Sequence, residues 1–170
     1  MASVDIKARF RLTIGDITRL KVVAIVNAAN TSLLGGGVEG AHPSGDRPRL
    51  LAECLKLGGC PPGEARLTGG HRSPASHVIH TVGRVEQPGS KQILESCYLS
   101  CLEIARSQGF RDIAFPAFAT GVYGFPREAA ALVAVSTIGS QQLPELVIFV
   151  CFDTATLNTY RNAVGYEGRE

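Results

Sequence analysis

The stretch Ile25-Val-Asn-Ala-Ala-Asn-Thr-Ser-Leu-Leu-Gly-Gly-Gly-Val-Glu-Gly40 predicts a buried strand that runs into a ligand-binding loop. Its first residues, Ile25 and Val26, are β-formers that suit a strand covered on both faces. Asn27 and Asn30 then place amide donors and acceptors where this strand ends. Because open α/β sheets bind ligands at the carboxyl ends of their strands, both amides are candidate ligand contacts.

Three glycines follow the amides, and a carboxylate follows the glycines. Gly35, Gly36 and Gly37 lack a Cβ atom, so their backbone N–H groups approach a ligand closely and line an anion-binding nest. Glu39 then stands beside whatever the glycines hold. Three glycines alone fit a surface turn equally well. The amides before them and the carboxylate after them favour the ligand loop.

A second glycine loop, Ala119-Thr-Gly-Val-Tyr-Gly-Phe-Pro126, follows another apolar strand and leads into a helix. Backbone N–H groups at a helix N-terminus favour anions, so two such loops side by side would clamp a diphosphate. Neither loop carries the Gly-Lys-Ser/Thr of a P-loop or the G-x-G-x-x-G of a dinucleotide fold. Phosphoryl transfer and hydride transfer therefore lack their usual parts.

The length and composition indicate one domain that spans residues 1–170. The apolar fraction of 45% and the charged fraction of 19% are ordinary for a globular protein. A net charge of +2 without any run of Lys or Arg argues against a nucleic-acid partner. No apolar run reaches the roughly 18 residues of a membrane span, so we expect no membrane partner.

The chain has five cysteines, an odd number, and no Cys-x-x-Cys pair, which argues against a disulfide framework. Cys97 and Cys101 lie four residues apart on a predicted helix and fit core positions better than a metal site. His80 lies in an apolar strand, where we expect a core histidine whose ring nitrogens are satisfied. No group of residues has zinc spacing, so we expect no metal and no cofactor. The expected location is intracellular and reducing, hence cytoplasmic.

Periodicity along the chain predicts alternating strands and helices, which means an α/β fold with a mixed or mostly parallel sheet. Alternation of apolar and polar residues over 6–14 predicts a half-buried strand near a sheet edge. The expected strands cover 6–14, 22–26, 63–69, 77–82, 112–118 and 145–152, and the expected helices cover 49–57, 91–108, 127–138 and 155–163.

Asp16 follows the first strand within Gly15-Asp-Ile17, and two roles are open to it. Its carboxylate fits the N-cap of the short turn that follows. It also fits an acceptor for the exocyclic amine of a bound base.

These motifs together resemble the macro domain, and within that family the MacroD-type branch. The resemblance rests on Gly15-Asp-Ile17, Val26-Asn-Ala-Ala-Asn30, the first glycine loop, Val78-Ile-His-Thr-Val-Gly83, Ala114-Phe-Pro116 and Thr120-Gly-Val-Tyr-Gly124, in the family's order over nearly the whole chain. It implies a three-layer α/β/α sandwich around a mixed, mostly parallel six-stranded sheet. It also implies binding of ADP-ribose, and hydrolysis of ADP-ribosyl esters on Asp/Glu side chains of proteins and in O-acetyl-ADP-ribose.

The resemblance assigns roles to residues at matching positions. Asp16 would accept from the adenine amine, with Ile17 and Phe152 beside the base. Phosphate contacts would come from Gly36, Gly37 and Val38 and from Thr120, Gly121 and Val122. Asn27 and Asn30 are amide contacts, with Asn30 on the distal ribose. Asn30, Tyr123 and Glu39 would form the catalytic group, in which Tyr123 packs on the distal ribose and Glu39 positions or activates water.

Several departures from the family pattern favour a second reading. Glu39 replaces an Asp, the glycine loop is one Gly shorter, and Ala119 replaces a Ser. A carboxylate displaced by about 1 Å loses catalytic power. The alternative function is therefore a reader module that binds ADP-ribose with little or no hydrolysis.

The largest departure is Ala41-His-Pro-Ser-Gly-Asp-Arg-Pro48, where the family reads Ala-Ile-His-Arg-Ala-Ala-Gly-Pro and begins a helix. Two prolines and a glycine should abolish that first turn. A compensated one-base frameshift over these codons would restore nearly the family text, and ordinary divergence is the alternative. Resequencing of the gene separates the two, because only a codon set that shifts in this way permits a frameshift.

Overall fold

The computed structural model describes residues 6–34, 47–83, 90–117, 126–142 and 144–165. The helices are α1 (Ile6–Arg9), the 3-10 helix η1 (Ile17–Arg19), α3 (Arg47–Leu57), α4 (Ser90–Gln108), α5 (Arg127–Gly139) and α6 (Thr154–Val164). The strands are β1 (Phe10–Ile14), β2 (Ala24–Ala29), β3 (Ala65–Gly69), β4 (His77–Val82), β5 (Asp112–Pro116) and β6 (Leu146–Cys151).

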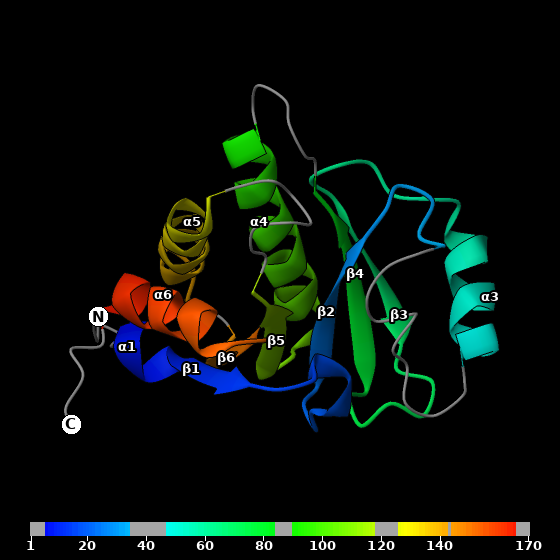
Figure 1. Ribbon diagram of the computed structural model, residues 1–170. Helices are drawn as coiled ribbons and strands as arrows, with labels where there is room; N and C mark the ends of the chain where they lie inside the picture. Colours follow the sequence, from blue (N-terminus) through cyan, green and yellow to red (C-terminus); the bar gives the residue numbers. More distant parts are fainter. Residues whose placement is uncertain (1–5, 35–46, 84–89, 118–125, 143, 166–170) are drawn as a thin grey trace.

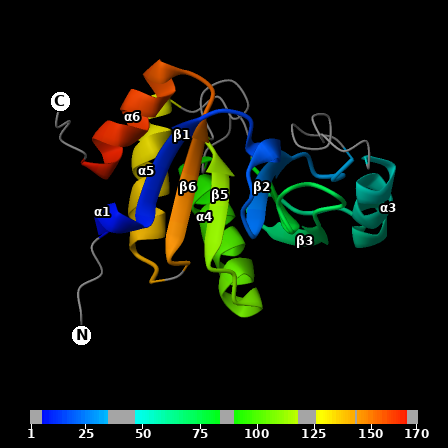
Figure 2. The same cartoon turned by 90° about the horizontal axis from the view of Figure 1, so that it is seen from below.

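The six strands form one sheet in the order β1-β6-β5-β2-β4-β3. All neighbours are parallel except β3 and β4, which are antiparallel, so the predicted mixed, mostly parallel sheet is confirmed. Figure 2 shows β1, β6, β5 and β2 following one another across the view. β2 is an interior strand with five of its six residues buried, as its apolar run predicted. β1 lies at the sheet edge, as its alternating pattern predicted.

One face of the sheet packs against α4, α5 and α6 (Figure 1). Alternate strand residues such as Ile113, Phe115 and Phe149 point into this layer and meet Tyr98 of α4 and Tyr160 of α6. The helical stripe predicted over 91–108 is confirmed, since its members from Leu94 to Ala105 are buried. This layer holds most of the core, because the largest buried cluster lies in it. Each fully buried side chain of Leu or Phe size contributes about 1.5–3 kcal/mol to the stability of the fold.

The opposite face is covered by two separate segments. The stretch that contains η1 packs over β5 and β6, where Ile17 contacts the cluster formed by Ala114 and Ile148. Further along the sheet, α3 packs beside β3, and its Leu50 and Cys54 share a buried cluster with residues at the ends of β2 and β4. Helices on both faces of one sheet make the predicted three-layer α/β/α sandwich.

The prediction of a single strand over 6–14 is wrong at its start, because residues Ile6–Arg9 form the short helix α1. Arg9, the last residue of α1, is only 4% exposed and reaches the segment between α5 and β6. Its Nε and Nη2 donate to the carbonyl oxygen of Pro144 at 3.2 and 2.9 Å, and its Nη1 donates to that of Gln141. Arg9 and Phe10 are both buried, which strict strand alternation does not allow.

The prediction that the first turn of a helix is lost over 41–48 falls mostly outside the described residues. The helix α3 begins at Arg47, with Pro48 in its first turn, where a missing backbone N–H costs nothing. All five cysteines are free and buried, including the predicted core pair Cys97 and Cys101.

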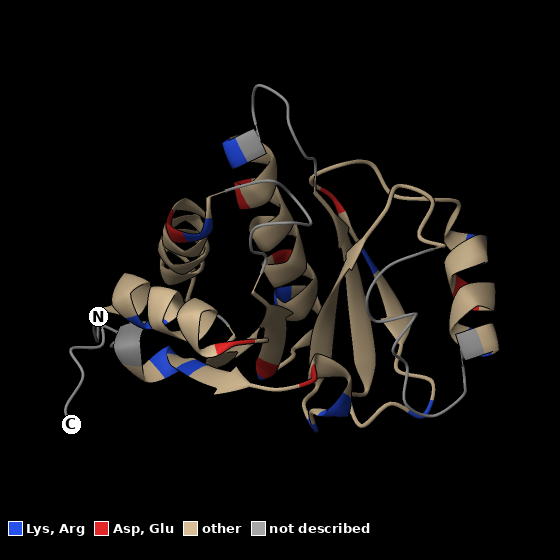
Figure 3. Ribbon diagram, in the orientation of Figure 1, with Lys and Arg blue, Asp and Glu red and all other residues tan. Residues whose placement is uncertain are grey.

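Within the described part of the chain, no helix has both the length and the apolar character that a membrane crossing requires. Figure 3 shows Lys and Arg interspersed with Asp and Glu over these elements.

Candidate functional site

The sheet order places the predicted ligand residues along one edge. Because β1, β6, β5 and β2 are parallel neighbours, their carboxyl ends meet at the same edge. Asp16 follows β1, Phe152 follows β6, the segment 118–125 follows β5, and Asn30 follows β2. At about 4.8 Å per strand, the ends of β1 and β2 lie roughly 14 Å apart. An elongated ligand that crosses the strand ends would meet these positions in that order.

The predicted capping role of Asp16 is confirmed, and its role as an acceptor for a bound base stays a prediction. Its Oδ1 caps η1 by accepting from the Thr18 backbone N–H at 2.9 Å and from the Thr18 hydroxyl at 2.6 Å. Its Oδ2 lies 3.7 Å from Arg19 Nε, and the Asp16 side chain is 47% exposed. The Thr18 hydroxyl, helped by the Thr18 backbone N–H and the charge of Arg19, holds the pKa of Asp16 below its ordinary value. One carboxylate oxygen is therefore fixed, and an anionic acceptor remains at the edge.

Phe152 is a large aromatic side chain at the same edge, and it is 65% exposed. It stands between Cys151, the last residue of β6, and Asp153, which caps α6 by accepting from the Thr156 backbone N–H at 2.7 Å. Strand and cap together fix its backbone. An exposed ring on a fixed backbone offers a stacking surface for a base. Ile17 is half-buried against the sheet face below this edge.

Asn30 stands at the other end of the row, exposed, just after β2. Its side-chain oxygen Oδ1 accepts from the Ser32 hydroxyl at 2.6 Å. Sequence reasoning missed Ser32. A local signal could have found it, because a Ser two residues after an Asn is close enough for their side chains to form a hydrogen bond.

Asn27 lies beneath the edge rather than on it, because its side chain is only 1% exposed. Its Nδ2 donates to His80 Nδ1 at 3.1 Å, and His80 Nε2 contacts Thr68 Oγ1 at 2.9 Å. Burial lowers the pKa of His80 to about 4, so the ring is neutral. Since an amide nitrogen only donates, the single ring proton is on Nε2 and is donated to Thr68.

The prediction that His80 is a core histidine is therefore confirmed, with an exposure of 0%. Its bonds join β4 to β2 and β3, and His80 pairs in register with Asn27 on one side and Arg66 on the other. Nothing local in the sequence marks this contact, because strand pairing alone creates it. The contact of Asn27 with a ligand stays a prediction.

The remaining predicted site residues lie outside the described residues. They are Gly36, Gly37, Val38 and Glu39 of the first glycine loop, and Thr120, Gly121, Val122 and Tyr123 of the second. Their roles stay predictions. Among the described residues, no group of His, Cys, Asp and Glu could hold a metal ion.

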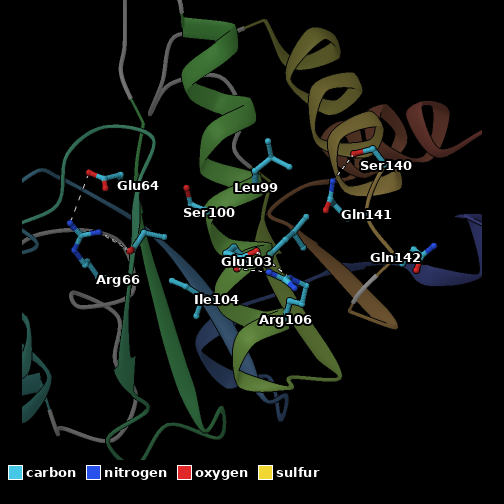
Figure 4. Close-up of a pocket in the computed structure, with 12 residues that line it drawn as sticks. Glu64, Arg66, Leu99, Ser100, Glu103, Ile104, Arg106, Ser140, Gln141 and Gln142 are labelled. Atoms are coloured by element: carbon cyan, nitrogen blue, oxygen red, sulfur yellow. Dashed lines mark hydrogen bonds and ion pairs between the residues drawn. The ribbon is translucent and has the colours of Figure 1, made fainter.

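A recess of about 830 Å³ lies beside α4, between the start of β3 and the end of α5 (Figure 4). Its charges are paired locally: Arg106 binds Glu103 at 2.6 Å, and Arg66 lies 4.0 Å from Glu64. None of the predicted site residues lines it. The carboxyl edge, not this recess, is the candidate functional site.

Comparisons with known proteins identify the family. The sequence model of the macro domain matches residues 26–134. A macro domain-containing protein of Mesorhizobium japonicum is 49% identical, over 92% of this chain and 93% of its own length. An O-acetyl-ADP-ribose deacetylase of Escherichia fergusonii is 45% identical, over 96% and 99%. The crystal structure of a Trypanosoma brucei macrodomain in complex with ADP-ribose superposes with a TM-score of 0.84 at 39% identity, covering 96% of this chain and 72% of that one. With these matches over nearly its whole length, the chain belongs to the macro domain family.

Proposed function

We propose that the protein binds ADP-ribose across the carboxyl edge of its sheet and hydrolyses esters formed on the distal ribose. The observation that carries this proposal is the strand order, which sets Asp16, Phe152 and Asn30 in one row. ADP-ribose has the same sequence of parts: a base, a ribose, a diphosphate and a second ribose. The span of about 14 Å suits a ligand extended in this way.

Each part of ADP-ribose has a matching group in the row. The adenine amine donates to the exposed oxygen of Asp16, and the ring of Phe152 flanks the base. We assign the diphosphate to the two glycine loops, through Gly36–Val38 and Thr120–Val122, which lie outside the described residues. The distal ribose lies by Asn30, with Tyr123 packed on it.

The reaction is hydrolysis of an acyl ester. Water adds to the ester carbonyl, the acyl–oxygen bond breaks, and the ribose oxygen takes up a proton, which gives a carboxylic acid and ADP-ribose. Glu39 orients or deprotonates the water, and Asn30 steadies the ribose. The substrates are O-acetyl-ADP-ribose and proteins that carry ADP-ribose on Asp or Glu. The near full-length match to an O-acetyl-ADP-ribose deacetylase supports this choice.

The second candidate is a reader that binds ADP-ribose and turns it over poorly. The observation that favours it is the first loop, where Glu39 replaces the family's Asp and one glycine is missing. Both candidates require ADP-ribose binding, so a binding measurement alone does not separate them.

The test is calorimetric titration with ADP-ribose, followed on the same sample by acetate release from O-acetyl-ADP-ribose. A flat titration at saturating ligand refutes both candidates. For a hydrolase, Glu39→Ala lowers kcat by roughly 10²–10⁴-fold while the Kd for ADP-ribose stays within about twofold. Glu39→Asp serves as the matched control, because it restores the family's carboxylate. An unchanged rate in Glu39→Ala would make this residue a bystander, and binding without turnover in the unmodified protein would favour the reader.

A further inference from the structure

The turn that carries Asn30 is anchored from below by buried groups. The Leu33 backbone N–H donates to the Asn30 carbonyl oxygen at 3.0 Å. Leu33 is fully buried against Leu50 and Cys54, although its φ of 62° is unusual for a residue with a side chain. A leucine holds such a conformation only where its surroundings fix it, so the turn has one shape.

A second anchor holds the next residue of the turn. The Cys60 backbone N–H donates to the Thr31 carbonyl oxygen at 2.9 Å. Beside it, Gly59 has a φ of +97°, and a Cβ atom there would come within 2.8 Å of that same oxygen. Only glycine permits this approach. The backbone from Asn30 to Leu33 is thus set by contacts that do not involve Ser32.

Ser32 forms a separate link between this backbone and the Asn30 side chain. The Leu34 backbone N–H donates to Ser32 Oγ at 3.2 Å, and the Ser32 hydroxyl donates to Asn30 Oδ1 at 2.6 Å. The last torsion of an Asn side chain is broad and nearly two-fold, so the chain itself does not decide which end of the carboxamide points outward. In the structure the Ser32 hydroxyl, whose oxygen already accepts from Leu34, donates its single proton to Oδ1, and this bond turns Nδ2 outward.

We propose that Ser32 is a positioning residue that presents the Nδ2 group of Asn30 to the distal sugar of the ligand. This inference rests on the proposed function. With Oδ1 occupied by Ser32, Asn30 acts as a donor, and no protein partner of Nδ2 is found in the described part of the chain. The group that it recognises is therefore a hydrogen-bond acceptor, an oxygen on the distal ribose.

ADP provides a control ligand, because it contains the adenine, the first ribose and the diphosphate but no distal sugar. Loss of the Ser32 hydroxyl in Ser32→Ala frees the carboxamide to turn. We expect the Kd for ADP-ribose to rise roughly fivefold, the equivalent of one hydrogen bond of about 1 kcal/mol. The Kd for ADP should stay unchanged. Ser32→Thr keeps the hydroxyl and should restore ADP-ribose binding.

A double-mutant cycle separates action through Asn30 from a direct effect of Ser32. If Ser32 acts through Asn30, Ser32→Ala has no further effect on the Kd for ADP-ribose in an Asn30→Ala protein. Asn30→Asp provides a second variant: its carboxylate still accepts from Ser32 but does not donate. We expect it to lose ADP-ribose affinity by more than Ser32→Ala while it retains ADP.

Matched controls and outcomes complete the experiment. Ser107 is an exposed serine of α4 whose hydroxyl donates to the Ile104 carbonyl oxygen at 3.1 Å, so Ser107→Ala should bind both ligands like the unmodified protein. Equal weakening of ADP and ADP-ribose by Ser32→Ala would show a general role in loop shape and overturn the inference. Additive losses in the cycle, or full ADP-ribose binding by Asn30→Asp, would overturn it too. If the unmodified protein binds ADP but not ADP-ribose, or neither ligand, the proposed function itself fails.

Discussion

Replacing Asp16 by asparagine separates the structural role of this side chain from its proposed role in reading the base. Asparagine keeps an oxygen that accepts from the Thr18 backbone and hydroxyl, which Asp16 Oδ1 does now at 2.9 and 2.6 Å. Asn and Asp are equally good helix caps, so the free energy of unfolding should change by less than about 0.5 kcal/mol. At the outer position, however, an NH₂ donor replaces the exposed oxygen.

The expected loss of affinity follows from the hydrogen bond that is removed. A bond to a charged group contributes about 1.5–3 kcal/mol, so the Kd of Asp16→Asn for ADP-ribose should rise roughly 10- to 150-fold. Asp16→Ala should lose the same contact and also about 1 kcal/mol of stability, because it loses the cap. Calorimetric titration and urea unfolding of the three proteins measure both quantities.

The inosine analogue of ADP-ribose tests the direction of the bond. Its base has an exocyclic oxygen in place of the amine, and this oxygen accepts from the amide of Asp16→Asn. The ratio of the two Kd values, inosine analogue over ADP-ribose, should therefore fall in Asp16→Asn. The reasoning is refuted if Asp16→Asn binds ADP-ribose like the unmodified protein, or if it loses affinity for both bases by the same factor.

Three further predictions concern one ligand contact and two buried groups. Phe152→Ala should weaken ADP-ribose binding by about 1–3 kcal/mol, which is the contribution of one base–aromatic stack. Its free energy of unfolding should change by less than about 0.5 kcal/mol, because the ring is 65% exposed. Leu132→Ala, at a site 58% exposed on α5, is the control in the same titration, and equal Kd values for the two variants would contradict the prediction. Stability should fall as the pH drops below about 6.5, because the unfolded chain then protonates His80 while the folded protein resists down to about 4. This contribution of His80 to the free energy of unfolding changes by about 1.5 kcal/mol between pH 6.5 and 5, as measured by urea unfolding. The change should be missing in His80→Gln, and equal slopes in both proteins would refute it. Arg9→Ala should lower the free energy of unfolding, measured in urea, by about 3 kcal/mol, because the carbonyl oxygens between α5 and β6 lose their donor. As the control, Arg11→Ala removes an exposed side chain and should lower it by less than about 0.5 kcal/mol. Similar losses in the two variants would show that the Arg9 contacts contribute little.

Much of the architecture was predictable because burial leaves a local trace in the sequence. The unbroken apolar runs of β2 and β6 indicated interior strands, and the stripe from Leu94 to Ala105 indicated the buried side of α4. Asp16 and Asn30 stood out because polar side chains directly follow strands there. The bond between Ser32 and Asn30 also lay within reach of sequence reasoning, since it joins residues two apart.

Other features left no local trace. The alternation over 6–14 continued through Arg9, and nothing nearby showed that this side chain bonds to Pro144 at the far end of the chain. The contact between Asn27 and His80 depends on the register of β2 against β4, which periodicity does not encode. Short-range patterns report which face of an element is buried, but not which element lies against it.

The sequence by itself determined the kinds of element, the two glycine loops, the polar residues at strand ends and the resemblance to macro domains. Only the tertiary structure decided that β6 and β5 lie between β1 and β2, and so that Asp16, Phe152 and Asn30 form a row about 14 Å long. It also decided which groups hold those side chains in place. The physical reason is that strand order and register follow from packing on both faces of the sheet, and that packing joins residues far apart in the chain.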